Sequence, residues 1–106
     1  MAIDLSSNTQ PVAFARTTLH ATAGNLDVLT LPIWCRQVTI SAIGTGNIKI
    51  THTGSQDAAI GSNYYTILNG EKLSLRNVRL HNTLFRVTGT VNSDPVEFIL
   101  EETWSE

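Results

Sequence analysis

Alternation of apolar and polar residues runs through most of this chain and is the feature that most constrains its fold. The alternation is clearest in residues 37–43, 47–51 and 96–101, and turn-forming residues separate these segments. A period of two places successive side chains on opposite faces of a strand, so each segment predicts a β-strand with one buried face. Many short strands with no helical segment between them predict a sandwich or a small barrel.

We expect about eight strands in one domain that spans residues 16–106. Their ranges are 16–22, 26–31, 34–43, 48–53, 64–68, 71–76, 78–80 continued by 83–88, and 96–102. The predicted fold class is all-β, an antiparallel β-sandwich of jelly-roll or immunoglobulin-like type. In the last strand, Val96, Phe98 and Leu100 are expected to face the core, with the glutamates between them outside.

Two turn signals predict hairpins. The glycine-containing turn 44–47 is expected to join the strands on either side of it. Asn69-Gly70 is the strongest hairpin signal, because both central residues of a type I′ turn need positive φ. This second hairpin would pair Tyr64 with Leu75 in the core. Tyr65 and Ile67 would then lie on the opposite face, where a partner covers them.

Residues 1–15 differ from the rest of the chain and are predicted to form an extended N-terminal arm. The segment is polar and turn-prone, with four apolar residues set into it: Ile3, Leu5, Val12 and Phe14. These four are candidate interface residues, because such an arm becomes ordered by lying against its own domain or a neighbouring subunit. We expect the neighbour. A basic segment followed by an apolar run is missing here, so no secretory signal is expected.

The balance of charge argues against several classes of partner. The formal net charge is −2, so we expect no attraction to nucleic acid. No apolar run has membrane-spanning length. Charged residues make up 15% of the chain, against about 25% in an average soluble domain. A surface of this kind suits packing against another protein, because little charge must be desolvated. An ordinary Thr-rich β-domain explains the composition equally well.

Residues that carry chemistry are sparse, and we expect no enzyme, no metal site and no cofactor. Cys35 lies in an apolar segment without an activating base nearby, which predicts a small buried side chain rather than a nucleophile. His20, His52 and His81 lie far apart in sequence, which favours unrelated surface histidines over zinc ligands. Asp57 lies in the longest loop, where we expect it to cap a turn rather than to bind calcium.

Aromatic and basic side chains give the remaining candidates for binding. Trp34, Trp104 and Tyr65 are interpreted as core residues, as anchors of a protein interface or, on a shared concave surface, as platforms for a glycan. Three arginines form a second candidate set: Arg76, Arg79 and Arg86. They are interpreted either as partners of glutamates on neighbouring strands or as a site that docks onto an acidic protein.

Several segments together resemble small β-sandwich virion proteins of tailed bacteriophages. These segments are VTIS (38–41), GNIKI (46–50), TGS (53–55), NGEKLSL (69–75), LFRVTG (84–89) and VEFIL (96–100), within roughly residues 35–102. Similar proteins decorate or cement capsids, or belong to tails and fibres. The resemblance therefore implies a non-enzymatic protein present in many copies.

The same resemblance implies a location in the virion after assembly in the host cytoplasm. The implied partners are capsid or tail subunits and further copies of the chain in a homo-oligomer. The alternative function that stays open is a carbohydrate-binding or tail/fibre adaptor module. No motif marks a functional residue that the resemblance would carry over.

Overall fold

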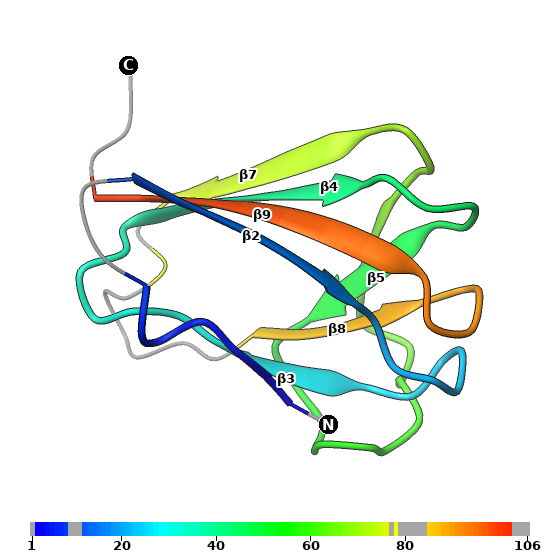
Figure 1. The fold of residues 1–106 in the computed structure, drawn as a ribbon. Coiled ribbons are helices and arrows are strands. Elements are labelled where there is room, and N and C mark those ends of the chain that lie inside the picture. Colours follow the sequence, from blue (N-terminus) through cyan, green and yellow to red (C-terminus); the bar gives the residue numbers. More distant parts are fainter. Residues whose placement is uncertain (1, 9–11, 77, 79–84, 103–106) are drawn as a thin grey trace.

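Nine β-strands form the fold of the described part of the chain (Figure 1). The computed structural model describes residues 2–8, 12–76, 78 and 85–102. The strands are β1 (Ile3–Asp4), β2 (Val12–Thr18), β3 (Asp27–Thr30), β4 (Gln37–Ala42), β5 (Ile48–Thr51), β6 (Tyr65–Ile67), β7 (Lys72–Arg76), β8 (Phe85–Gly89) and β9 (Pro95–Glu101). The expected all-β class is confirmed, since the described residues contain no helix.

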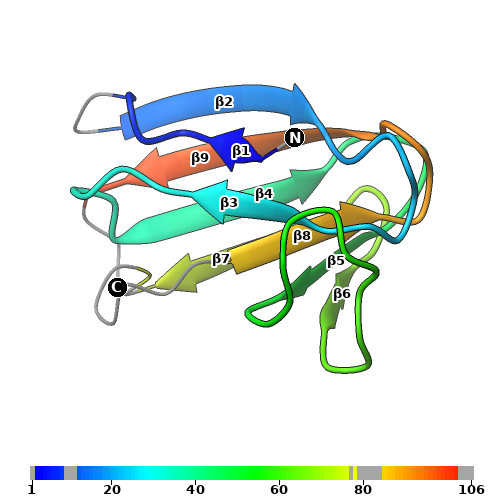
Figure 2. The ribbon, with the colours of Figure 1, turned by 90° about the horizontal axis from the view of Figure 1, so that it is seen from below.

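The strands form two packed sheets, a four-stranded sheet with the order β2-β9-β4-β7 and a five-stranded sheet with the order β1-β3-β8-β5-β6 (Figures 1 and 2). Four antiparallel pairs are nested in one another: β2 with β9, β3 with β8, β4 with β7 and β5 with β6. They make one long hairpin that is rolled up, because β4 also pairs with β9 and β5 with β8. This is the order of a jelly roll, and it differs from the immunoglobulin order.

The inward faces of both sheets meet in one core. Val96, Phe98 and Leu100 face inward from β9 and are buried, as the alternation predicted. Leu29 and Val87 meet them from the five-stranded sheet. Burying a side chain of this size stabilises a fold by about 1.5–3 kcal/mol. The core therefore fixes which face of each strand is left for other contacts.

Neither expected hairpin forms, because each pair of strands is divided between the two sheets. β4 lies in the four-stranded sheet and β5 in the five-stranded sheet, and β6 and β7 are divided in the same way. The turns themselves are where the sequence predicted them. The Glu71 N–H donates to the Leu68 carbonyl at 2.9 Å, and Gly70 has a φ of 83°. The two turns carry the chain from one sheet to the other.

This crossing reverses the faces expected for β6. Ile67 is paired with Ile48 and is buried at 2% exposure, and Tyr65 lies on the same face of β6. Tyr64 points the other way, where the ammonium of Lys49 lies 4.6 Å from the centre of its ring. The expectation that a partner covers Ile67 is therefore wrong, since its own domain buries it.

The N-terminal segment packs on its own domain. β1 pairs in parallel with β3, and the Leu5 N–H donates to the Thr30 carbonyl at 2.9 Å. Ile3 and Leu5 belong to the core, at 6% and 7% exposure. These two residues are thus not available to a neighbouring subunit, contrary to the expectation. The expected boundary after residue 15 falls inside β2.

The loop 52–63 covers part of the outer face of the five-stranded sheet. Its backbone bonds to the segment before β3: the Leu26 N–H donates to the Ala58 carbonyl and the Asp57 N–H to the Leu26 carbonyl, both at 2.8 Å. In Figure 2 this loop crosses in front of β8 and reaches the start of β3. On β8 the neighbours of Thr88 face the core, so Thr88 itself points to the outer face of the sheet. It is nevertheless fully buried. One sheet of the sandwich is therefore partly covered on its outside by the chain itself.

Candidate interaction site

Strand β2 forms the outer edge of the four-stranded sheet. It pairs with β9 along all seven of its residues, and no strand in the described part of the chain pairs with its other side. In both ribbon views β2 lies at the outside of its sheet (Figures 1 and 2). An unpaired edge presents backbone N–H and C=O groups that can bond to another strand.

The other three edges of the described sheets are short or charged. β1 has two residues and β6 has three. β7 has five residues and carries exposed Lys72 and Arg76 at its two ends. Short strands and edge lysines are ways in which proteins prevent unwanted pairing. β2 has seven residues with Arg16 as its one charged side chain, so it is the long edge with the least protection among them.

Exposed apolar side chains lie on the outer face of this edge. Phe14 is 74% exposed and Val12 is 45% exposed. Ile99 of β9 lies directly opposite Phe14 and extends the apolar surface inward along the sheet. Arg16 pairs with Glu97 across the same two strands at 3.7 Å, and their side chains are 67% and 45% exposed. Such a pair contributes little to stability, so it leaves the guanidinium available for a further contact.

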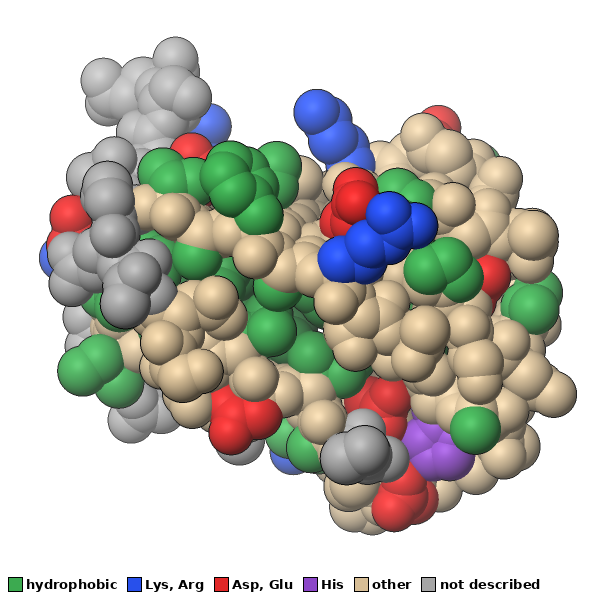
Figure 3. Space-filling view, in the orientation of Figure 1, with side chains coloured by type: hydrophobic (Ala, Val, Ile, Leu, Met, Phe, Trp, Pro, Cys, Tyr) green, Lys and Arg blue, Asp and Glu red, His purple; other side chains and the backbone are tan. Residues whose placement is uncertain are grey.

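A hollow of about 600 Å³ lies between β2 and the N-terminal strand β1. Its lining comes from residues 2–5, from residues 16–21, and from Asp27 and Ser93. Figure 3, which looks onto this side, shows hydrophobic side chains at the floor of the hollow. The two sheets are thus not fully closed on the β1–β2 side, where part of the core is accessible to solvent.

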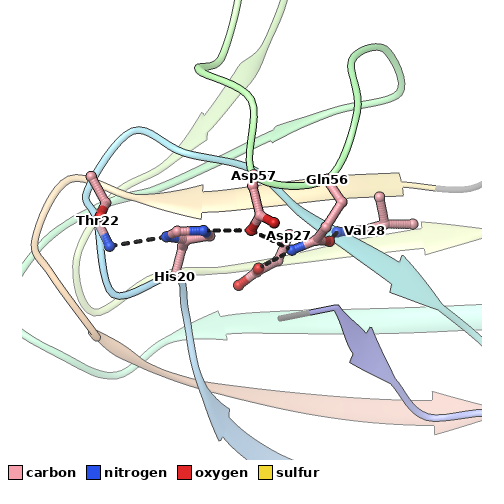
Figure 4. Close-up of polar contacts among 6 residues, drawn as sticks. All are labelled: His20, Thr22, Asp27, Val28, Gln56 and Asp57. Carbon is pink, nitrogen blue, oxygen red and sulfur yellow. Dashed lines mark hydrogen bonds and ion pairs between the residues drawn. The ribbon is translucent and has the colours of Figure 1, made fainter.

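His20 and two aspartates meet near this hollow in a hydrogen-bond network (Figure 4). The Thr22 N–H donates to His20 Nδ1 at 3.0 Å. A neutral ring with an accepting Nδ1 carries its proton on Nε2, and this Nε2–H donates to Asp57 Oδ1 at 2.7 Å. The bonds from His20 and Gln56 lower the pKa of Asp57 below its usual value. His20 is therefore not an isolated surface histidine, as the sequence suggested, but a partner of a residue 37 positions away.

Gln56 completes the network and joins the long loop to β3. Its Nε2 donates to Asp27 Oδ1 at 2.8 Å and to Asp57 Oδ1 at 3.0 Å, and its Oε1 accepts from the Val28 N–H at 2.7 Å. Ligand atoms of His20, Asp27 and Asp57 lie within 4.8 Å of one another. A metal ion needs an unprotonated ring nitrogen, but one nitrogen of His20 holds a proton and the other accepts from Thr22. The cluster is best explained as a structural clamp on the loop.

A second hollow of about 550 Å³ lies between the edges β6 and β7, on the side opposite β2. Leu73, Leu75 and Phe85 line it, with polar groups from His52 and Asn63. Tyr65, at 61% exposure, is also part of the lining. Tyr65 is one of the aromatic residues singled out as glycan platforms, and the structure places it on a concave surface.

The remaining candidates are distributed over different parts of the sandwich. Trp34 is half-buried against the core, and its Nε1–H donates to the Asn8 carbonyl at 2.9 Å. Arg76 lies on β7, in the four-stranded sheet. Arg86 lies on β8 in the other sheet, where its Nη1 donates to the His52 carbonyl at 3.1 Å. These two arginines therefore do not form one docking site.

Arg79 and Trp104 fall outside the described residues, so their expected roles stay predictions. Cys35 is confirmed as a buried small side chain, and its thiol donates to the Gln37 carbonyl at 3.2 Å. Burial raises the pKa of this thiol, which disfavours the reactive thiolate.

Comparison of the chain with protein-family models, curated proteins and solved structures gives no match. In the described part of the chain there is no helix with the length and apolar character needed to cross a membrane.

Proposed function

We propose that this chain is a non-enzymatic structural protein of a virion, of the capsid decoration or cement type, which binds and stabilises a larger protein assembly. The observation that carries the proposal is the β2 side of the sandwich. A seven-residue edge strand, a Phe14 side chain that is 74% exposed and an open hollow coincide there. We refer to Val12–Thr18, with the hollow beside it, as the β2 surface.

The physical basis of the proposal is the cost of leaving this surface in water. Burying an exposed phenylalanine against a partner contributes about 1.5–3 kcal/mol, and aromatic residues often dominate the energy of an interface. The low proportion of charged residues keeps the desolvation cost of the surrounding surface small. Jelly-roll folds occur in viral capsid domains and in lectins, so the fold agrees with this role.

The test is to purify virus particles from the host that carries this sequence and to look for the protein in them. Quantitative mass spectrometry is expected to find many copies per particle. Particles stripped of the protein are then incubated with the purified chain, with Phe14→Lys and with the control Leu68→Lys, which alters an exposed leucine near the opposite edge. Rebinding is expected for the wild type and the control, and it should be weak for Phe14→Lys. Absence of the chain from particles would contradict the proposal.

A second candidate function is glycan binding at the hollow between β6 and β7. It is favoured by Tyr65, which is exposed in a concave surface beside the polar groups of His52 and Asn63. The open face of an aromatic ring packs well against the C–H groups of a sugar, while polar neighbours bond to its hydroxyls. A glycan array, followed by titration of any ligand against the wild type and Tyr65→Ala, tests it. Loss of binding in the variant is expected, and an array without signal would remove this candidate.

A further inference from the structure

We infer that the partner of the β2 surface is a second copy of this chain, bound so that the two β2 strands pair antiparallel about a two-fold axis at Ala15. The inference rests on the proposed function, because it names a partner for the surface proposed there. Pairing of this kind joins the two four-stranded sheets edge to edge into one continuous sheet. The contact is isologous, which is the usual symmetry of a homodimer.

The alternation of side chains limits the register of such a pair. Residues that lie directly opposite each other in an antiparallel pair point to the same face. Val12, Phe14 and Arg16 point outward, while Ala13 and Ala15 point to the core side. A symmetric pair that preserves both faces can therefore be centred on a single residue of the strand, but not between two residues.

The two-fold axis can lie at Phe14, Ala15 or Arg16, the three central residues of β2. An axis at Ala15 fits the side chains best. A centre at Arg16 would place two guanidinium groups opposite each other, which is unfavourable. A centre at Phe14 would pair residues 12–16 and leave the last two residues of β2 without partners from the same strand. A centre at Ala15 pairs all seven residues, with Val12 opposite Thr18 of the second copy. We therefore take Ala15 as the axis position.

In this register the exposed side chains of the β2 surface also gain contacts with the second copy. Phe14 of each copy lies opposite Arg16 of the other, so each ring contacts a guanidinium by a cation–π interaction. Glu97 remains on the far side of Arg16 in its own sheet. On the core side, Ala13 meets Thr17 and Ala15 meets Ala15, and these small side chains let the backbones approach. The net charge of −2 per chain opposes association only weakly.

The hollow beside β2 gives a second reason for a copy of the same chain. The two-fold axis runs perpendicular to the joined sheet. The β1 edges of both copies therefore lie on the same face of the joined sheet. The two hollows of about 600 Å³ then face each other across the axis. Each copy covers the apolar floor that Figure 3 shows open to solvent in the single chain.

Disulfide trapping tests the register directly. In the proposed pair the two Ala15 Cα atoms lie about 4.5–5.5 Å apart, within the span of about 4.4–6.8 Å that a disulfide bridges. Ala15→Cys is oxidised with copper phenanthroline and run on a non-reducing gel. Thr17→Cys is the matched control. In this register Thr17 of one copy lies opposite Ala13 of the other, so the two Thr17 residues are offset by four positions, or about 13 Å along the strands. The native Cys35 is buried, so the wild type serves as the blank.

We expect a covalent dimer for Ala15→Cys and at least tenfold less of it for Thr17→Cys. A mixture of Ala13→Cys with Thr17→Cys should give the heterodimer, since these positions face each other in the same register. Equal trapping at 15 and 17, or no trapping at 15 in a protein whose unfolding curve is unchanged, would overturn the inference. If trapping fails while the chain still rebinds to particles, the partner at β2 is foreign, and the proposed function stands without the homodimer.

Discussion

At the scale of single residues, a buried carboxylate explains why glycines occupy the turn at residues 44–46. Asp94 is buried, and its two oxygens accept from the Thr45 N–H and the Gly46 N–H, both at 2.9 Å. A Cβ at Gly44 would overlap this carboxylate. The glycine pattern at 44–46 therefore serves a tight turn capped by an acidic side chain from a distant part of the chain.

We predict strong coupling between Asp94 and Gly44. Asp94→Ala should lower the free energy of unfolding by about 2–4 kcal/mol, because buried backbone donors lose a charged acceptor. Gly44→Ala alone should cost about 1–3 kcal/mol from overpacking, and much less when Asp94→Ala is already present. Urea denaturation of the two single variants and the double variant measures the coupling. Additive costs would show that the close approach is not the reason for the glycine.

The Asp57 carboxylate should make stability depend on pH in the acid range. Its pKa in the folded protein lies below the ordinary 3.8, first because of the bond from His20 and then because of Gln56. A lowered pKa stabilises the folded state above the unfolded-state pKa, and this contribution is lost as the pH falls through the folded-state pKa.

The comparison variant is Asp57→Asn, because asparagine tolerates the φ of 69° at this position. The wild type should lose stability relative to Asp57→Asn as the pH falls below about 4. Denaturant unfolding curves at several pH values measure this difference. A difference that stays constant through the acid range would contradict the role given to the His20–Asp57 bond.

At the scale of elements, the N-terminal segment is part of the sandwich and not a free arm. Leu5→Ala should lower the free energy of unfolding by about 2–3 kcal/mol, because it removes a core side chain at the edge of the five-stranded sheet. Ser7→Ala is the control, since this exposed residue lies outside the strand, and its effect should stay within about 0.5 kcal/mol. Thermal and urea unfolding give both values. Equal, small effects would mean that the segment does not pack as described.

Alternation and turn residues were sufficient to predict most strands, but not their partners. β9, β4 and β5 were expected close to their observed positions, because period two reports on the faces of a strand. The turns at Gly44–Asn47 and at Asn69-Gly70 were correct as turns and wrong as hairpins. A turn signal is local, whereas the rolled-up order depends on pairs such as β2 with β9, which lie at opposite ends of the chain.

The candidate site was predictable in part for the same reason. Phe14 and Val12 were named from the sequence and are exposed, and Tyr65 lies in a hollow. Ile3, Leu5 and Ile67 were assigned to an interface and lie in the core, because an apolar residue at a strand position fits either environment. The His20–Asp57 bond was missed, since nothing in the local sequence of either residue points to the other.

At the scale of the whole molecule, the sandwich is closed unevenly. The loop 52–63 covers part of one outer face, and among the described strands three of the four sheet edges are short or charged. The β2 surface combines a long edge, an exposed aromatic side chain and an open hollow. The proposed association rests on these features, and the β2 surface is where it is expected.

Sedimentation velocity of the purified chain, of Phe14→Lys and of Leu68→Lys tests this claim most directly. The wild type and Leu68→Lys are expected at twice the chain mass of 11.6 kDa, because Leu68 lies away from the β2 surface. Phe14→Lys is expected at the mass of a single chain, since its new ammonium group would lie opposite Arg16 of the second copy. A single-chain mass for all three proteins, or a dimer that Phe14→Lys leaves intact, would contradict assembly through β2.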